Sequence, residues 1–437
     1  MNYQEALVYL EELQKFGSKF GLVRIERLTE LLGQPQERYH TIHVTGTNGK
    51  GSVSTMTASI LTRSGIHTGL YVSPHLTSYT ERIQIDGQYI SEEDFARQLT
   101  AVRTIAEQMV AEGEESPTQF EVLTALAFLY FAEKKVEYAV IEVGLGGLLD
   151  STNVITPEVS VITNVTMEHA DRCGGTLEGI AHHKAGIIKD GVPVVTAAKG
   201  MPLEILRETA REKNADIFVE GEDFHSNFVR FYGYMQQLEF SSALLGVNHA
   251  LYALQLLGTH QIENSALAVM TAELLHNTDS RITSETITQA LAIAVWPGRF
   301  ERMDLGAQRI IVDGAHNPAG MKSLRSSLDT YFPEGDRVFL LGILKDKDID
   351  AMLPELLRPN DMVVMTTPDS ERAADPGVVA YKVHAQTVEV EPDRALALEK
   401  ALAMAAETGR LLCVAGSLYL VGEIRQLLLA RKEKMER

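Results

Sequence analysis

Cysteine, tryptophan and positive charge are all scarce in this sequence. Its 437 residues include one tryptophan and two cysteines, Cys173 and Cys413. Two distant cysteines supply neither a disulfide framework nor a full set of zinc ligands, so we expect a reducing compartment, the cytoplasm. Forty lysines and arginines face fifty-nine acidic residues, which gives a formal net charge of −19. This charge disfavours non-specific binding to nucleic acid or acidic membranes but allows a local basic pocket for an anion.

Long apolar runs are also missing. The longest strongly apolar stretch, residues 123–132, ends at Glu133 and is too short to span a bilayer. The first residues show no basic segment followed by an apolar one, so we expect no signal peptide. Hydrophobic residues make up 45% and charged residues 23% of the chain, the balance of a globular protein. The length predicts two or three domains.

Strand-like and helix-like segments alternate along almost the whole chain, which predicts α/β layers with mostly parallel sheets. The expected strands are 39–44, 136–143, 159–165, 192–196, 309–312, 337–341, 362–366 and 411–415. The pattern breaks at the Trp-Pro-Gly-Arg sequence of residues 296–299. We therefore expect a large N-terminal P-loop-type α/β domain, residues 1–296, and a smaller Rossmann-like α/β domain, residues 297–437. Alternating polarity over 220–240 predicts a β-hairpin.

The strongest local motif is Gly46-Thr47-Asn48-Gly49-Lys50-Gly51-Ser52, between the strand 39–44 and a predicted helix 52–64. Glycines let backbone N–H groups approach phosphate oxygens, the helix N-terminus adds positive potential, and the lysine reaches the β/γ-phosphates. The motif departs from a standard Walker A sequence because Val44 stands where the first glycine would be. The alternative is a glycine-rich turn with an exposed lysine, but the strand–turn–helix context favours a phosphate site.

Four further side chains have the chemistry of a nucleotide–metal site. Glu142 ends an apolar strand, where doubly wound sheets bind ligands, and its carboxylate suits Mg²⁺. Ser73 ends the strand after the P-loop helix, and His169 follows the strand 159–165. Lys184 precedes an apolar run, and a buried, uncharged lysine can react with CO₂. The alternatives are a turn-capping carboxylate, a plain Ser-Pro turn, a packing histidine and a salt-bridging lysine.

The predicted second domain has its own candidates. Asp313 and His316 lie in the loop that directly follows the strand 309–312, where they can contact a ribose or a second substrate. The alternative is a simple Asp-Gly turn. Arg299 follows the Trp-Pro-Gly hinge and is placed to reach across an interdomain cleft and neutralise phosphate charge.

Taken in order, these motifs resemble the folylpolyglutamate synthase/dihydrofolate synthase family of the Mur ligase superfamily. The likeness runs nearly end to end, and the shared order makes it specific. The matching segments are 46–52, 73–76, 81–83, 118–121, 142–147, 149–153, 184–187, 258–261 with Asn264, 296–299, 313–318 and 416–419.

The resemblance implies an ATP-dependent amide ligase. In the family, ATP phosphorylates a substrate carboxylate and the amino group of L-glutamate attacks the acyl phosphate. The matching ATP-binding residues are Thr47, Asn48, Gly49, Lys50, Gly51, Ser52, Asn264, Arg299 and Asp313. The matching ligands of Mg²⁺, of which we expect two ions, are Ser73, Glu142 and His169. Lys184 matches a carbamoylated lysine, and we take Lys50, Lys184 and His316 as the catalytic residues.

The resemblance also implies two further substrates, a folate or dihydropteroate and L-glutamate, and a monomeric enzyme. The positions that match the pterin pocket are Gly21, Leu22, Thr118, Gln119, Phe120, Glu121, Leu149, Asp150 and Ser151. Ser417 and His316 are the candidates for the glutamate and acyl-phosphate region.

This chain departs from the family pattern at several positions. Leu148 replaces a usual arginine, Glu168 a usual aspartate and His183 a usual glutamate, while Cys173 and Thr80 replace a usual leucine and asparagine. Most of these changes gather around the acceptor and the carbamoyl-lysine loop. The acceptor therefore stays open: a folate for polyglutamylation, dihydropteroate, both, or a non-folate carboxylate. A protein that binds ATP without catalysis is a further alternative.

Overall fold

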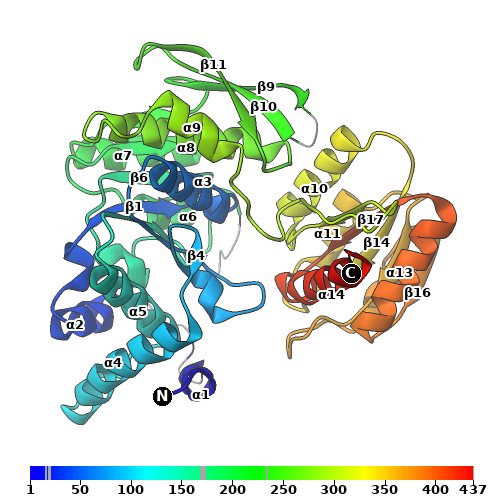
Figure 1. Ribbon diagram of the computed structural model, residues 1–437, viewed down its shortest axis with the longest axis horizontal. Helices are drawn as coiled ribbons and strands as arrows, with labels where there is room; N and C mark the ends of the chain where they lie inside the picture. Colours follow the sequence, from blue (N-terminus) through cyan, green and yellow to red (C-terminus); the bar gives the residue numbers. More distant parts are fainter. Residues whose placement is uncertain (15–16, 18–20, 168–173, 233–234, 437) are drawn as a thin grey trace. The chain divides into compact units, whose positions relative to one another are not determined.

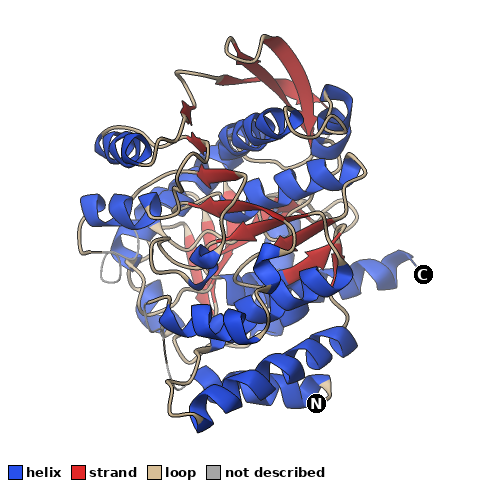
Figure 2. Ribbon diagram, turned by 90° about the vertical axis from the view of Figure 1, so that its left-hand side faces the viewer, coloured by secondary structure: helices blue, strands red, loops and turns tan. Residues whose placement is uncertain are grey.

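The computed structural model describes residues 1–14, 17, 21–167, 174–232 and 235–436. The chain forms two compact units (Figure 1). Unit 1 comprises Met1–Gln255 and Ile262–Val295, and unit 2 comprises Leu256–Gln261 and Trp296–Arg437. Each unit contains a largely parallel sheet, so the predicted α/β class is confirmed. Figure 2 shows strands flanked by helices.

Unit 1 is built on an eight-stranded sheet with the order β4-β3-β2-β5-β1-β6-β7-β8. Its strands are β1 (His40–Thr45), β2 (Thr68–Tyr71), β3 (Ile83–Ile85), β4 (Gln88–Tyr89), β5 (Tyr138–Glu142), β6 (Val159–Ile162), β7 (Val194–Thr196) and β8 (Ile217–Val219). Strands β2, β5, β1, β6, β7 and β8 pair in parallel with their neighbours in this order. At one edge, β3 pairs antiparallel with β2, and β4 pairs antiparallel with β3. The strands predicted around β1, β5, β6 and β7 are therefore present.

Helices cover both faces of this sheet, as crossover connections between parallel strands require. They are α1 (Tyr3–Gln14), α2 (Val23–Leu31), η1 (Pro35–Glu37), α3 (Lys50–Arg63), η2 (Tyr79–Arg82), α4 (Glu92–Ala111), α5 (Gln119–Lys134), η3 (Ser151–Val154), α6 (Leu177–Ala185), α7 (Met201–Glu212), α8 (His260–His276) and α9 (Ser284–Leu291). The helix predicted at 52–64 begins two residues earlier, because the glycine-rich turn ends at Gly49 and Lys50 is already helical.

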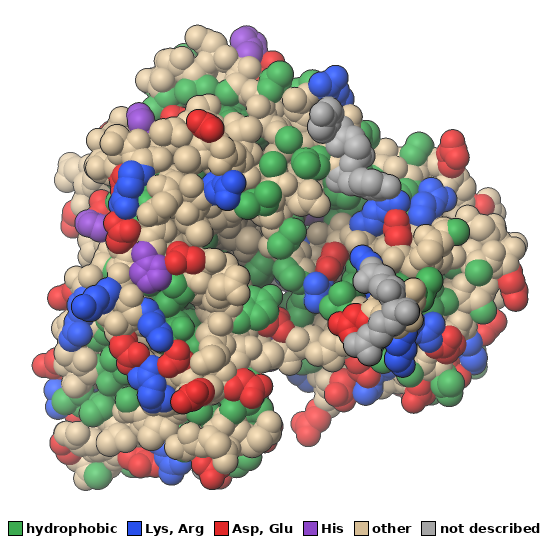
Figure 3. Space-filling model, in the orientation of Figure 1, with side chains coloured by type: hydrophobic (Ala, Val, Ile, Leu, Met, Phe, Trp, Pro, Cys, Tyr) green, Lys and Arg blue, Asp and Glu red, His purple; other side chains and the backbone are tan. Residues whose placement is uncertain are grey.

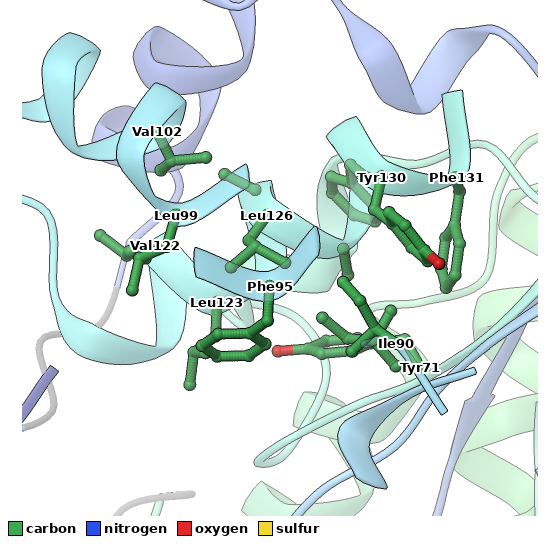
Figure 4. Packing of buried hydrophobic residues seen from close by; sticks show 14 of the residues in the cluster. Tyr71, Ile90, Phe95, Leu99, Val102, Val122, Leu123, Leu126, Tyr130 and Phe131 are labelled. Carbon is green, nitrogen blue, oxygen red and sulfur yellow. The ribbon is translucent and has the colours of Figure 1, made fainter. Parts of the chain in front are cut away.

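The main core of unit 1 lies between the sheet and helices α4 and α5. Phe95 of α4, Leu123 and Leu126 of α5 and Tyr71 of β2 are fully buried in it. Figure 4 shows these side chains gathered against one another. Helix α5 is apolar on almost every side, which is typical of a helix that is buried all round. Each such side chain stabilises the fold by about 1.5–3 kcal/mol relative to exposure.

A separate antiparallel sheet follows β8. It consists of β9 (His225–Tyr232), β10 (Met235–Ser242) and β11 (Val247–Leu254) in the order β11-β10-β9. The predicted β-hairpin is confirmed by the pairing of β9 with β10, but its third strand was not predicted. The sequence of β11 contains Asn, Ala and Leu, which favour a strand only weakly, so its conformation depends on pairing with β10.

Unit 2 has a six-stranded sheet with the order β12-β13-β17-β14-β15-β16, parallel except for β12. The strands are β12 (Glu301–Arg302), β13 (Ile310–Val312), β14 (Arg337–Leu341), β15 (Met362–Met365), β16 (Thr387–Val390) and β17 (Leu411–Ala415). The helices are α10 (Pro318–Tyr331), α11 (Ile349–Leu356), α12 (Pro376–Ala380), α13 (Arg394–Thr408) and α14 (Leu418–Glu436). All four strands predicted after residue 297 are present.

The surface carries mixed charge. On the face shown in Figure 3, acidic and basic side chains are interspersed. Many cations are paired locally: Arg27 contacts three glutamates, and Arg281 contacts Glu137 and Asp279. Within the described ranges, no helix is both long and apolar enough to cross a bilayer.

Candidate active site

The carboxyl ends of four parallel strands meet at one edge of the sheet in unit 1. Val44 of β1 is level with Glu142 of β5, and Tyr71 of β2 is level with Ile141 of the same strand. On the other side of β1, Thr45 is level with Ile162 of β6. The loops that follow β1, β2, β5 and β6 therefore lie together, where ligand sites of parallel sheets are found.

The predicted phosphate loop occupies the centre of this edge. Lys50 is the first residue of α3, and its Nζ donates to the carbonyl oxygens of Gly46 at 3.0 Å and Thr47 at 3.1 Å. Gly51 and the buried Ser52 continue the first turn of the helix. The positive side chain and the helix N-terminus thus lie beside the same glycine-rich loop, an arrangement that attracts anions.

Residues after β6 hold the phosphate loop in place. Asn164 Oδ1 accepts the backbone N–H of Asn48 at 3.0 Å, and Thr163 Oγ1 donates to the Asn48 carbonyl at 2.6 Å. Thr47 Oγ1 accepts the N–H of Thr166 at 3.0 Å. Thr163 and Asn164 were not predicted as site residues from the sequence. A polar Thr-Asn pair directly after a buried strand was the available signal.

Two glycines allow this close packing. Gly46 has a φ of +150° and Gly49 a φ of +88°, both costly for other residues. A Cβ on Gly46 would overlap Thr163 Oγ1, and a Cβ on Gly49 would overlap Oδ1 of Asn264. Helix α8 therefore brings the predicted ATP contact Asn264 against the phosphate loop.

The two described candidate metal ligands are adjacent. Glu142 Oε2 accepts the backbone N–H of Ser73 at 2.9 Å, and the Glu142 side chain is almost fully buried. A buried carboxylate beside a serine hydroxyl is a set of hard oxygen donors, which fits Mg²⁺. The third candidate, His169, lies outside the described residues, as do Glu168 and Cys173. Among the residues that are described, no three His, Cys, Asp or Glu side chains are grouped closely enough to hold a metal.

The predicted acceptor loop follows β5. Buried Asp150 accepts three hydrogen bonds there: from the N–H of Leu145 at 2.8 Å, and from the N–H and the hydroxyl of Thr152 at 3.0 and 2.6 Å. Burial raises the pKa of Asp150, and these bonds partly oppose that shift. Ser151 is buried beside it, whereas Leu149 is 37% exposed.

A second part of the predicted acceptor site lies at the start of α5. Thr118 caps this helix, and Glu121 Oε2 accepts the Thr118 N–H at 2.7 Å and Nε of Arg24 at 3.1 Å. Glu121 Oε1 is buried and has no hydrogen-bond partner among the described residues. Arg24, which was not predicted from the sequence, is on α2 just after Gly21 and Leu22.

Gln119 and Phe120 link α5 to neighbouring loops. Gln119 Nε2 donates to the hydroxyl of Tyr79 at 3.0 Å, and the ring of Tyr79 lies 4.3 Å from that of His75. Burial lowers the pKa of His75 to about 4, so this imidazole is neutral at pH 7. Phe120 packs so close to Gly144 that a Cβ there would overlap its ring.

Lys184 is buried near the end of α6, next to the acceptor loop. The carbonyl of His183 accepts the N–H of Leu148 at 2.7 Å, so two of the positions that depart from the family pattern are in direct backbone contact. Burial and then the charge of Lys184 lower the pKa of His183.

In unit 2, Asp313 organises the loop after β13. Its Oδ2 accepts the N–H of Phe300 at 2.7 Å and its Oδ1 the N–H of Ala315 at 2.8 Å. The Arg299 guanidinium lies over Gly314, where a Cβ would overlap it. Arg299 and Asp313 are thus neighbours.

His316 and Ser417 lie at the same edge of unit 2, because β13 and β17 are adjacent parallel strands. His316 Nδ1 donates to the carbonyl of Gly314 at 2.7 Å. Buried Ser417 accepts the N–H of Leu420 at 3.2 Å and so caps α14.

Comparison with known proteins identifies the family to which this chain belongs. Residues 44–272 match the model of the Mur ligase middle domain, and residues 298–418 match that of the Mur ligase glutamate ligase domain. Folylpolyglutamate synthase of Lacticaseibacillus casei is 34% identical over 441 residues, covering 99% of this chain and 100% of that one. Dihydrofolate synthase/folylpolyglutamate synthase of Bacillus subtilis is 33% identical, covering 98% and 99%. The chain belongs to the folylpolyglutamate synthase/dihydrofolate synthase family of Mur ligases.

A solved structure agrees with this assignment. Mycobacterium tuberculosis folylpolyglutamate synthase, complexed with ADP and AMPPCP, has a TM-score of 0.88 and 30% identity, covering 98% of this chain and 99% of that one. As a member of this family of Mur ligases, the protein is an ATP-dependent ligase with small-molecule substrates. The middle-domain match spans the phosphate loop, Glu142 and Lys184, and the ligase-domain match spans Arg299 and Ser417.

Proposed function

We propose that this protein uses ATP to join L-glutamate to a carboxyl group of a folate, of dihydropteroate, or of both. The observation that carries the proposal is the sheet edge of unit 1. There an anion-binding loop, a buried Glu142 and the polar loop around Asp150 lie beside one another. The names of the relatives from L. casei and B. subtilis support the two acceptors.

The phosphate loop would bind ATP through its backbone N–H groups and Lys50. Asn264, against Gly49, is our candidate for a further contact in unit 1. Arg299 and Asp313 are the candidates in unit 2. Ser73, Glu142 and His169 would hold Mg²⁺, for which we propose two ions; when bound, the metal offsets the charge of the transferring phosphoryl group.

The reaction then has two balanced steps. The γ-phosphoryl group passes from ATP to an oxygen of the acceptor carboxylate, and ADP leaves. The uncharged amino group of L-glutamate attacks the acyl carbon, phosphate leaves, and the nitrogen loses a proton. His316 holds its Nδ1 proton on the Gly314 carbonyl, so proton exchange with a substrate would take place at Nε2. We place Ser417 beside the glutamate and the acyl phosphate.

The acceptor would bind between the loop 149–151 and the start of α5, with Gly21, Leu22 and Thr118–Gln119–Phe120 along its path. Glu121 Oε1 supports this placement, because a buried carboxylate oxygen without a donor is costly and a pteridine ring offers N–H donors. We also propose that Lys184 is carbamoylated, since a buried amine beside this loop would then add a carboxylate-like group that supports a metal.

The direct test is phosphate release from ATP with L-glutamate, with the product identified by mass. Dihydropteroate and a reduced monoglutamyl folate are compared as acceptors. A gain of one glutamate on dihydropteroate shows dihydrofolate synthase activity, and a gain on the folate shows polyglutamylation. Phosphate release that neither pteridine stimulates, with ATP still bound, contradicts the proposal and points to a different carboxylate, consistent with Leu148 and His183.

The same preparation tests the remaining expectations. We propose that the enzyme is a monomer that works in the cytoplasm. Light scattering should therefore give 48.2 kDa. A species of twice that mass at micromolar concentration would contradict the monomer.

A further inference from the structure

Strand β1 has an unusual buried face. A central strand of a parallel sheet is buried on both sides and is normally apolar throughout. In β1, Ile42 and Val44 follow that rule, but the alternate positions Thr41, His43 and Thr45 are polar and equally buried. Buried polar side chains are retained at a cost unless they are hydrogen-bonded, so their partners indicate what this face does.

All three polar side chains bond to the segment that follows β5. Thr45 Oγ1 donates to the carbonyl of Gly146 at 2.6 Å, and Thr41 Oγ1 to the carbonyl of Thr156 at 3.4 Å. Between them, His43 Nε2 lies 2.8 Å from Oγ1 of Thr152. Three side-chain hydrogen bonds from alternate residues of β1 therefore hold residues 146–156. The phosphate loop follows the end of the same strand.

The hydrogen bond between His43 and Thr152 extends to Asp150. The Thr152 hydroxyl is 2.6 Å from Asp150 Oδ1 and has a single proton to donate. With an ionised Asp150, which only accepts, this proton goes to the carboxylate, and His43 Nε2–H donates to the Thr152 oxygen. His43 Nδ1 is buried and has no hydrogen-bond partner among the described residues, which suits an unprotonated nitrogen.

We propose that His43 is a positioning residue for the acceptor: its neutral imidazole holds Thr152, and through it Asp150, in the geometry that binds the acceptor substrate. The inference rests on the proposed function for the identity of that acceptor, a pteridine acid (a folate or dihydropteroate). His43 lies on β1, the strand before the phosphate loop, and acts on the acceptor site without touching the substrate. Because side chains of β1 hold residues 146–156, the strand that leads into the phosphate loop also helps to position the acceptor loop.

Variants on the two sides of the hydrogen bond test the proposal. His43→Leu and Thr152→Val both remove the bond while roughly keeping shape, whereas His43→Gln keeps an N–H donor. Thr68→Val is the matched control, because Thr68 is a buried threonine of β2 whose hydroxyl donates to the nearby carbonyl of Ile66 at 2.8 Å. Hydrogen exchange of amides 145–153 should be faster in the first two variants, close to the wild type in His43→Gln, and unchanged in Thr68→Val.

Steady-state kinetics give the functional readout. We expect KM for the pteridine acid to rise about ten- to a hundredfold in His43→Leu and in Thr152→Val, as for a displaced binding group. KM for ATP should change less than about threefold, and His43→Gln should recover most of the loss. Equal increases in both KM values, or no rescue by glutamine, would overturn the positioning role.

The two proposals fail differently. If the wild type ligates no pteridine, the proposed function is wrong. Faster exchange of amides 145–153 in His43→Leu would still show that His43 holds this loop in place. If pteridine ligation is normal and exchange of these amides is unchanged in both His43→Leu and Thr152→Val, the His43 proposal is wrong. If one of the two variants fails to fold, the other decides the question.

Discussion

Buried polar side chains dominate the site at the scale of single residues. Glu142, Asp150 and Glu121 are all almost fully buried, and each accepts a backbone N–H: Glu142 from the loop after β2, Asp150 from its own loop and Glu121 from the start of its own helix. Bonds of this kind compensate part of the desolvation cost of a carboxylate. The conformation of these loops therefore depends on the buried carboxylates. Removing one carboxylate should weaken ligand binding and also reduce the local order of the loop.

Lys50 gives the simplest test of the phosphate loop. In Lys50→Ala, turnover should fall about 10²–10³-fold, the usual loss when one electrostatic donor to a transition state is removed. Lys213→Ala, a partly exposed lysine at the end of α7, is the control and should keep wild-type turnover. Phosphate release from ATP measures both. Near-normal turnover in Lys50→Ala would show that the phosphate site is elsewhere.

His43 makes stability depend on pH. Burial lowers its pKa from an ordinary 6.5 to about 3, so below pH 6.5 the unfolded chain binds a proton that the folded chain refuses. The free energy of unfolding should therefore fall by about 1.4 kcal/mol for each pH unit from 6.5 towards 3. This loss is absent above pH 6.5.

His43→Gln removes this contribution. Between pH 7.5 and pH 5, the wild type should lose about 2 kcal/mol more unfolding free energy than the variant. Urea unfolding at the two pH values, followed by a probe in unit 1, measures the difference. An identical pH dependence in the two proteins would show that the imidazole is already protonated or exposed.

At the scale of elements, helix α3 has a glycine with positive φ at each end. Gly49 precedes the helix with a φ of +88° in contact with Asn264, and Gly65 follows it with a φ of +77° and open space around it. The two positions differ in crowding far more than in backbone strain. They form a natural pair of variants for separating the two effects.

Gly65→Ala should cost about 1 kcal/mol of stability from strain alone and leave ATP binding unchanged. Gly49→Ala should cost more, because its Cβ displaces Asn264, and should weaken the affinity for a non-hydrolysable ATP analogue at least about tenfold. Calorimetric titration and urea unfolding provide the two quantities. Equal losses of affinity in both variants would mean that crowding at the loop is unimportant.

At the scale of the whole molecule, each unit has its own core and its own group of candidate residues at the carboxyl ends of its parallel strands. Our proposal uses both, since Lys50 and Asn264 belong to unit 1 and Arg299 and Asp313 to unit 2. A ligand that contacts a unit protects that unit from opening, by about 2.7 kcal/mol at a hundredfold excess over Kd.

Hydrogen exchange with a non-hydrolysable ATP analogue tests this arrangement. Amides 46–52 of unit 1 and 297–316 of unit 2 should both be protected, and Lys50→Ala should lose both effects at the same concentration. Amides 398–404 within helix α13 of unit 2, to which we assign no ligand contact, are the internal control. Protection confined to unit 1 would remove Arg299 and Asp313 from the ATP site.

Much of this architecture could be predicted locally. Gly49 and Lys50 lie between a strand pattern and a helix pattern, and Glu142 ends an apolar run, so a shared sheet edge follows from parallel pairing alone. The third strand of the small sheet, β11, could not be predicted, because its residues favour a strand only when β10 is beside them.

The sequence by itself determined the α/β class, the phosphate loop and the order of the motifs, because these depend on periodicity and on residues close together in the chain. Only the tertiary structure decided that Thr163 and Asn164 hold that loop, that Arg24 contacts Glu121, and that His43 reaches Thr152. These contacts join residues about 100 positions apart in the chain. Their existence depends on which strands are neighbours and which face each side chain occupies, and no local pattern encodes either.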